Sequence, residues 1–206
     1  MSGCSTWFAK ASTSTRPHDG LWWGFQPVNF RHVFAGGVHY RVADAAWADP
    51  LDASYSARTG ARWNAPGSFG VLYLSTTLGV ARANVRRLFH GQPYGPEDLD
   101  PSAAPVLIDV DLQEDDYVDV VTPDGIAAAG LPATYPLAAD GRTVPHTTCQ
   151  PVGQEAYLAG ERGMVCISAA RGTAETELAW FALPNRRIPA RIRTRGFPDW
   201  YWYSPG

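Results

Sequence analysis

The chain has 206 residues, of which 45% are hydrophobic and 12% aromatic, so it can bury a core of ordinary size and is not disordered as a whole. Only 18% of the residues are charged and the formal net charge is −3, which excludes a protein that coats nucleic-acid phosphates with a basic face. Twenty glycines and 17 prolines predict many turns and short elements, which disfavours a helical bundle.

Residues 1–25 are predicted to form a polar N-terminal arm, followed by one domain over residues 26–206. The arm lacks the apolar segment of a secretory signal, and no apolar run approaches the ~20 residues that cross a bilayer. We therefore expect a cytoplasmic protein with no membrane contact. The three widely spaced cysteines (Cys4, Cys149 and Cys166) contain no CxxC pair, so no disulfide framework and no metal site is expected.

The first half of the domain contains three recognisable elements. Two β-like runs between Phe30 and Val42 flank Ala35-Gly36-Gly37, which predicts a hairpin. Residues 71–75 form a buried-strand candidate, and Thr76 or Thr77 then caps a helix that runs to about Phe89. The helical period puts Val80, Ala81, Val85 and Leu88 on one buried face, together with Asn84.

The second half alternates strands with irregular segments. Strands are expected at 106–112, 117–121, 163–168 and 178–183, an irregular loop at 130–150, and a short helix at about 151–160. The arginine-rich tail after residue 185 favours a solvated edge strand over a nucleic-acid contact. These elements predict a single α+β domain with a mixed, mostly antiparallel β core and short flanking helices.

Several polar residues occur in apolar or turn surroundings: Tyr40-Arg41, Arg62-Trp63-Asn64, Tyr73, Asn84 and Ser168. Each has a structural alternative. Arg41 fits a surface strand position, Trp63 and Tyr73 fit the core, Asn84 fits a hydrogen-bonded structural amide, and Ser168 fits the turn after a strand. No position taken alone indicates a function.

Taken in order, these residues resemble the RES domain family, which is named for an arginine, a glutamate and a serine. The matching segments are Tyr40-Arg41, Gly60-Ala61-Arg62-Trp63-Asn64, the strand that ends in Tyr73-Leu74-Ser75, and Gly163 to Ala169 with its Ser168. The resemblance spans about residues 30–185. It implies an ADP-ribosyltransferase-like fold and a toxin that consumes NAD, paired with an antitoxin protein that plugs the site.

The chain departs from the family pattern at one position. The family glutamate belongs in the helix after the Tyr-x-Ser strand, where this sequence reads Ala81-Arg82-Ala83-Asn84-Val85. The resemblance thus assigns Arg41, Asn84 and Ser168 to catalysis. Asn84 keeps hydrogen-bonding capacity but lacks the negative charge, and the loss of one such group typically slows a reaction by ~10²–10³. Glu155, Glu161, Glu175 and Glu177 are available as replacements, and the sequence does not place them.

NAD fits the remaining candidates. Guanidinium groups bind pyrophosphate well, and Arg41 and Arg62 are the candidates for this contact. Aromatic side chains pack against the rings of NAD. We expect Tyr40, Arg62, Trp63, Asn64 and Tyr73 to bind it. NAD is then substrate rather than cofactor, with inorganic phosphate as co-substrate if the nicotinamide–ribose bond is broken by phosphorolysis.

The alternatives that stay open are hydrolysis of that bond, ADP-ribosylation of a protein, another nucleoside substrate, and a binder of NAD or of a partner protein without turnover. The sequence does not decide the oligomeric state, and a homodimer is one option.

Overall fold

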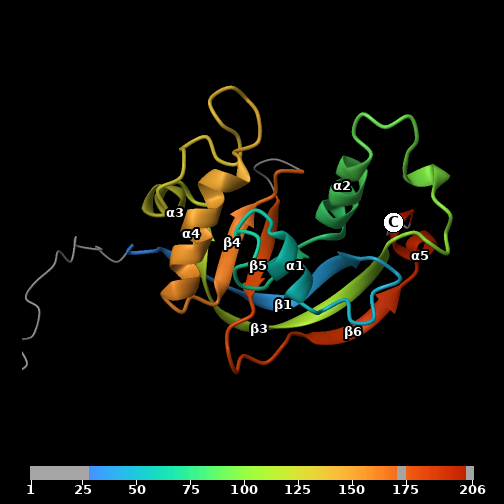
Figure 1. Cartoon of the computed structure of the whole chain (residues 1–206), viewed down its shortest axis with the longest axis horizontal. Helices are drawn as coiled ribbons and strands as arrows, with labels where there is room; N and C mark the ends of the chain where they lie inside the picture. Colours follow the sequence, from blue (N-terminus) through green and yellow to red (C-terminus); the bar gives the residue numbers. More distant parts are fainter. Residues whose placement is uncertain (1–27, 171–174, 203–206) are drawn as a thin grey trace, which may run out of the picture.

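The structure is a computed structural model, and it describes residues 28–170 and 175–202; the predicted arm at 1–25 lies outside them. The elements are β1 (His32–Ala43), α1 (Ser54–Thr59), β2 (Val71–Ser75), α2 (Leu78–Leu88), a 3₁₀ turn (Pro96–Asp98), β3 (Val106–Val120), α3 (Pro123–Ala128), α4 (His146–Leu158), β4 (Gly163–Ile167), β5 (Thr176–Phe181), β6 (Ala190–Arg195) and α5 (Phe197–Tyr201) (Figure 1). A six-stranded mixed sheet with short helices confirms the predicted α+β class.

The strand order is β1-β2-β5-β4-β3-β6, and β1 pairs with β3 as well. Only the β3–β4 pair is parallel. Because β1 contacts both β2 and β3, five of the strands form a closed ring, and β6 extends it along the outer edge of β3. The ring closes at one residue pair, Tyr40 opposite Ser75. The predicted edge strand at the C-terminal end is confirmed as β6.

The predicted hairpin around Gly36-Gly37 is wrong, because β1 runs through this segment as one strand with an irregularity between Ala35 and Gly37. Gly36 passes so close to β3 that an added Cβ would lie 2.6 Å from the Cα of Glu114. Gly37 has a φ of 77°, which a β-bulge uses and most side chains avoid. The glycine pair therefore bends a strand instead of reversing the chain.

The two strands predicted at 106–112 and 117–121 are one continuous strand, β3. The intervening residues 113–116 are polar and largely exposed where the long strand bends. Asp115 and Asp116 still pair with β1, and residues 113 and 114 lie opposite its irregularity. Their composition resembles a loop, although their backbone stays extended.

The helix after β2 is confirmed as α2, and the Thr77 hydroxyl caps it by accepting a hydrogen bond from the Val80 amide at 3.1 Å. Val80, Ala81 and Val85 are buried as expected, whereas Leu88 is 72% exposed because the helix extends past the sheet. Helix α4 begins at His146, earlier than predicted, with Pro151 in its interior. Burial of Cys149 in the additional turn offsets the hydrogen bond that proline cannot donate.

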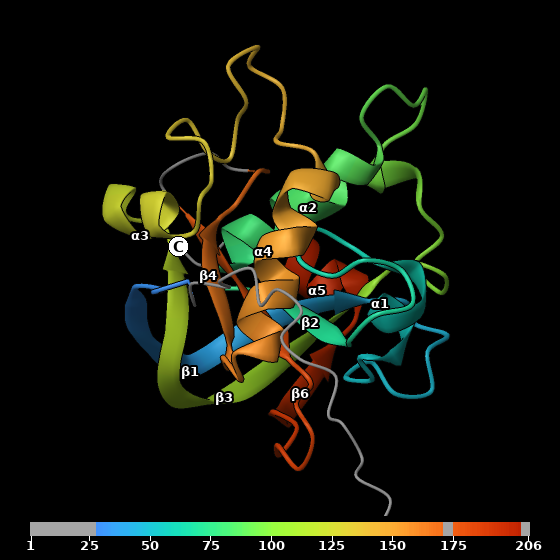
Figure 2. The ribbon, with the colours of Figure 1, turned by 60° about the vertical axis from the view of Figure 1, so that its left-hand side comes forward.

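Helices α2 and α4 lie on the same side of the sheet, above β1 and β3, in both views (Figures 1 and 2). The main core lies beneath α4 and is built around Trp63, Phe181 and Met164. A smaller core packs α2 and α5 against β1 and β3. Helices α2 and α4 thus cover neighbouring parts of the same sheet.

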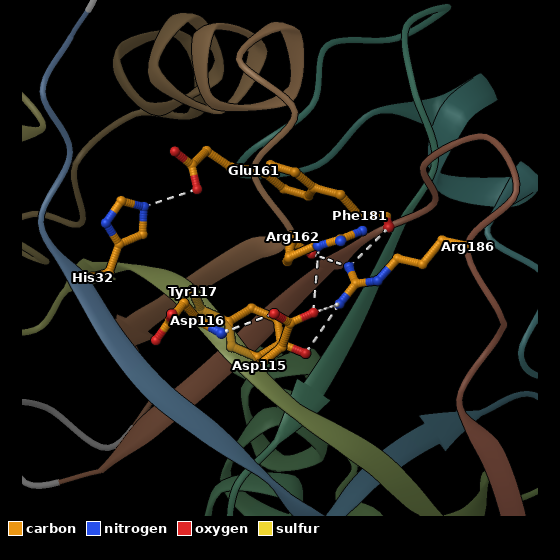
Figure 3. A network of polar contacts seen from close by, with 8 residues as sticks. All are labelled: His32, Asp115, Asp116, Tyr117, Glu161, Arg162, Phe181 and Arg186. Atoms are coloured by element: carbon orange, nitrogen blue, oxygen red, sulfur yellow. Dashed lines mark hydrogen bonds and ion pairs between the residues drawn. The ribbon is translucent and has the colours of Figure 1, made fainter.

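A polar network fastens the end of β5 to β3 and β4 (Figure 3). Asp115 of β3 forms ion pairs with Arg162 at 3.4 Å and with Arg186 at 3.6 Å. The Arg186 guanidinium also donates to the Phe181 carbonyl at 3.3 Å and lies 4.6 Å from the ring centroid of Trp180. This end of the sheet is opposite the one where β5 begins and β4 ends.

Within the described residues, Cys149 and Cys166 are buried free thiols, and no group of His, Cys, Asp and Glu side chains is arranged to hold a metal ion. None of the helices described is long and apolar enough to cross a membrane.

Candidate active site

A cavity of about 250 Å³ lies where β2 ends and β5 begins, between α2 and the first turn of α4. Five segments far apart in the sequence contribute to its wall. The lining residues are Ala61, Arg62, Tyr73, Leu74, Ser75, Asn84, Arg87, His146 and Glu177. Three of the residues selected from the sequence, Arg62, Tyr73 and Asn84, therefore meet in one cavity.

The strand register explains how Glu177 enters this cavity. Ser75 of β2 lies opposite Glu177 of β5, which in turn lies opposite Cys166 of β4. Residues paired across strands share one face of a sheet, and here that face also carries the inward-facing Ala179 and Phe181 of β5. Glu177 thus occupies the last position of an otherwise apolar row that faces the core.

Glu177 is half-buried and held by two neutral donors. Its Oε1 accepts a hydrogen bond from Asn84 Nδ2 at 2.6 Å and a longer one from Ser168 Oγ at 3.3 Å. Its Oε2 accepts no hydrogen bond from the described residues. The carboxylate is therefore oriented through one oxygen, and the other is left for the cavity.

Arg62 brings a buried positive charge to the same wall. Its residue is 8% exposed, it forms no ion pair with any described residue, and its Nη1 lacks a hydrogen-bond partner there. Burial alone would lower its pKa, yet Tyr135, the two buried cysteines and, least of all, Glu177 together raise the pKa overall. Because a buried guanidinium without an ion pair costs several kcal/mol, this arrangement favours an anionic ligand.

Tyr73 lines the cavity and is fixed from behind by the Trp63-Asn64 segment. Its hydroxyl accepts a hydrogen bond from the Trp63 amide at 3.0 Å and donates to Asn64 Oδ1 at 2.9 Å. The Asn64 amide donates to the carbonyls of Ser56 at 2.7 Å and Phe69 at 3.0 Å. Trp63 and Asn64 are fully buried, so they support the cavity wall without lining it.

The structure does not bring Arg41 or Tyr40 to the cavity. Arg41 alternates with Tyr40 along β1 and lies on the other face of the sheet, where its Nε donates to the Pro50 carbonyl at 2.5 Å. Burial lowers the pKa of Arg41 to about 10, against the opposing effect of Asp49 and Asp52. Tyr40 faces the α2 side, and the Arg195 guanidinium lies 5.7 Å from its ring centroid.

Ser168 is fully buried at the end of β4, and it reaches the cavity only through its hydrogen bond to Glu177. Its hydroxyl also accepts a hydrogen bond from the Ala170 amide at 3.2 Å. This position suits a residue that orients the carboxylate more than one that contacts a ligand.

Two cavity residues, Arg87 and His146, were missed in the sequence. Arg87 lies on the exposed part of α2, and His146 opens a helix whose start was placed five residues too late. Partial burial, followed by the charges of Arg62 and Arg87, lowers the pKa of His146, so its imidazole is neutral at physiological pH. The prediction left out the first turn of α4, and it is this turn that places His146 near Arg62.

A second hollow of about 390 Å³ continues from the cavity past Arg87. Its lining is cationic on the α2 side, with small residues opposite. The residues are Ala83, Arg86, Arg87, His90, Ala169 and Ala170. Because Arg87 lines both, the cavity and the hollow adjoin, with the Glu177 carboxylate in the wall of the first and the guanidinium groups of Arg86 and Arg87 in the wall of the second.

Comparison with known proteins supports this architecture. One similar solved structure is the M. tuberculosis MbcT-MbcA toxin-antitoxin complex, matched with a TM-score of 0.67 and 22% identity over 82% of this chain and 91% of that chain. No curated protein matches the sequence significantly. The family model described as the RES domain matches residues 38–201. With most of its length covered by that model, the chain belongs to the RES domain family.

Proposed function

We propose that the protein consumes NAD by cleaving its nicotinamide–ribose bond, in a toxin-like role. The observation that carries the proposal is the cavity itself, where a buried guanidinium that forms no ion pair with a described residue, a tyrosine and a half-buried carboxylate line one space. A dinucleotide with an anionic pyrophosphate and a cationic reacting end matches this separation of charges.

The reaction needs little proton transfer. The bond between the ribose C1′ and the nicotinamide nitrogen breaks, and its electron pair leaves with nicotinamide, which departs as a neutral molecule. Positive charge develops at C1′ and is stabilised by the carboxylate on the cavity wall. A phosphate oxygen then bonds to C1′ and gives ADP-ribose 1-phosphate; if water is the acceptor, it loses a proton to solvent.

Each of the two hollows holds a different part of NAD. The 250 Å³ cavity suits the nicotinamide and its ribose, with Tyr73 as the ring neighbour. The second hollow suits the pyrophosphate, because Arg87 borders both spaces and Arg86 and His90 follow along α2. Phosphorolysis is the favoured route, since the Arg62 and Arg87 charges that attract the pyrophosphate also attract inorganic phosphate.

The partner we propose is a protein antitoxin that occupies the site. Support comes from the fold shared with a toxin that was solved in complex with its antitoxin. An ADP-ribosyltransferase and a binder without turnover are the competing outcomes.

The test is incubation of the purified protein with NAD, with and without phosphate, followed by measurement of free nicotinamide and of the ribose product. We expect nicotinamide release that phosphate accelerates. Stable NAD binding by calorimetry without release would support the binder instead. Release that requires added protein, with ADP-ribose attached to it, would support the transferase.

Arg87→Gln tests the placement of the pyrophosphate. We expect the KM for NAD to rise about tenfold with a smaller change in kcat, because a phosphate contact is worth about 1.5 kcal/mol in such charge-assisted pairs. Arg58→Gln is the matched control, an exposed arginine of α1 whose guanidinium contacts Ser54. An unchanged KM in Arg87→Gln would place the pyrophosphate elsewhere.

A further inference from the structure

We propose that Glu177 is the catalytic carboxylate of this protein, with Asn84 and Ser168 as its positioning residues. The inference rests on the proposed function. It assigns the negative charge that stabilises C1′ to strand β5, because position 84 of helix α2 provides only an amide. Among the described residues, Glu177 is the one carboxylate that lines the cavity.

The position of Glu177 is unusual for a structural residue. It continues the inward-facing row of Ala179 and Phe181, where an apolar side chain would be the stable choice. A partly buried carboxylate there costs desolvation energy, and the residues that the structure describes offer it hydrogen bonds from an amide and a hydroxyl but no ion pair. A charge kept at such a position is more consistent with binding or catalysis than with stability.

The two donors orient this carboxylate. Asn84 Nδ2 and Ser168 Oγ approach the same oxygen, Oε1, from α2 and from the end of β4. Oε2 accepts no hydrogen bond from the described residues, so it is available to stabilise positive charge at C1′ or to accept hydrogen bonds from the ribose hydroxyls. Neutral donors suit this task, because they hold the carboxylate without cancelling its charge.

Of the four carboxylates that the sequence leaves available, the geometry selects this one. Glu161 forms a hydrogen bond with His32 Nε2 at 2.9 Å, and Glu155 borders an apolar hollow on the far side of α4. Glu175 accepts a hydrogen bond from the capping residue Thr77 at 2.8 Å, at the start of α2. Each of these three has a position outside the cavity wall.

Glu177→Gln is the direct test, because it keeps the shape and removes the charge. We expect the kcat for nicotinamide release to fall by about 10²–10³, with NAD or ADP-ribose binding by calorimetry retained within about threefold. Glu161→Gln is the matched control and should leave kcat unchanged. An active wild type whose Glu177→Gln variant stays within threefold of its kcat would overturn the proposal.

A second, independent test places a carboxylate at position 84 of helix α2. Asn84→Glu alone places two carboxylates within hydrogen-bond distance, so we expect it to lose activity near neutral pH and to regain it as the pH falls and one of them is protonated. The double variant Asn84→Glu with Glu177→Gln restores a single carboxylate and should exceed the Glu177→Gln rate. Higher activity in Asn84→Glu than in wild type would contradict the assignment and indicate a site that lacks its charge.

The failures of the two proposals are distinguishable. Absence of nicotinamide release by the wild type and by every variant would remove the proposed function, and the assignment of Glu177 with it. Release by the wild type that survives loss of the Glu177 charge would remove the assignment alone.

Discussion

At the scale of single residues, the cavity wall depends on the buried amide of Asn64, whose oxygen and nitrogen both form hydrogen bonds within the protein. Asn64 joins three backbone or side-chain groups from separate segments, at Ser56, Phe69 and Tyr73, while it is itself fully buried. Its role is to set the position of the Tyr73 ring, which is the part of this network that lines the cavity.

Asn64→Ala is therefore expected to lower the free energy of unfolding by about 3 kcal/mol, because it removes three buried hydrogen bonds, at the carbonyls of Ser56 and Phe69 and at the Tyr73 hydroxyl. Chemical denaturation with the exposed amide variant Gln113→Ala as control measures the effect. A loss below 1 kcal/mol for Asn64→Ala would show that the network does not hold the wall.

His146 reports on the charge of the cavity. Its pKa is lowered by partial burial and by the Arg62 and Arg87 charges, so the folded state binds this proton less readily than the unfolded chain. Stability contributed by His146 is present above the unfolded pKa of about 6.5 and declines as the pH falls below it. NMR titration should give a pKa below 6.5 that rises when inorganic phosphate binds, and a pKa that does not respond to phosphate would contradict an anion site here.

At the scale of elements, strand alternation decides which candidates share the site. Neighbouring residues of a strand face opposite sides, so Tyr40 and Arg41 cannot both reach one cavity. The alternation also turns Glu177 inward with Ala179 and Phe181, whereas Leu178 and Trp180 pack on the other face. The sequence predicted a strand at 178–183, which leaves Glu177 outside it, whereas β5 begins at Thr176. Both faces of β5 are apolar, so only the register with β2 shows that Glu177 lies at the cavity.

Helix α4 reaches the Arg62-Trp63 segment because Gly153 lets the two backbones meet. A Cβ at this glycine would overlap the carbonyl oxygen of Trp63. Gly153→Ala should therefore destabilise the protein by about 3 kcal/mol, opposite in sign to the usual gain of about 1 kcal/mol for alanine in a helix. Thermal unfolding beside Gly79→Ala, where the added Cβ meets only side-chain atoms, tests this; a stabilised Gly153→Ala variant would contradict the close approach.

At the scale of the whole molecule, the sequence predicted the class of fold and most of the strands, because the apolar runs are well separated by turns. It failed where composition and backbone disagree: the glycine pair inside β1, the polar middle of β3, and the proline inside α4. Arg62, Tyr73 and Asn84 were found through a family resemblance. Glu177 and His146 required the tertiary arrangement, because Asn84 lies 93 residues before Glu177 in the chain and the arginines near His146 also come from distant segments.

The central claim is that this arrangement holds the reacting end of NAD against Glu177. A crystal structure of the Glu177→Gln variant with NAD tests it most directly, since the slowed variant should retain its substrate. We predict the nicotinamide riboside in the cavity beside Tyr73, C1′ facing the side chain at position 177, and the pyrophosphate along Arg87. NAD bound outside this cavity, or with its adenine end inside it, would contradict the account.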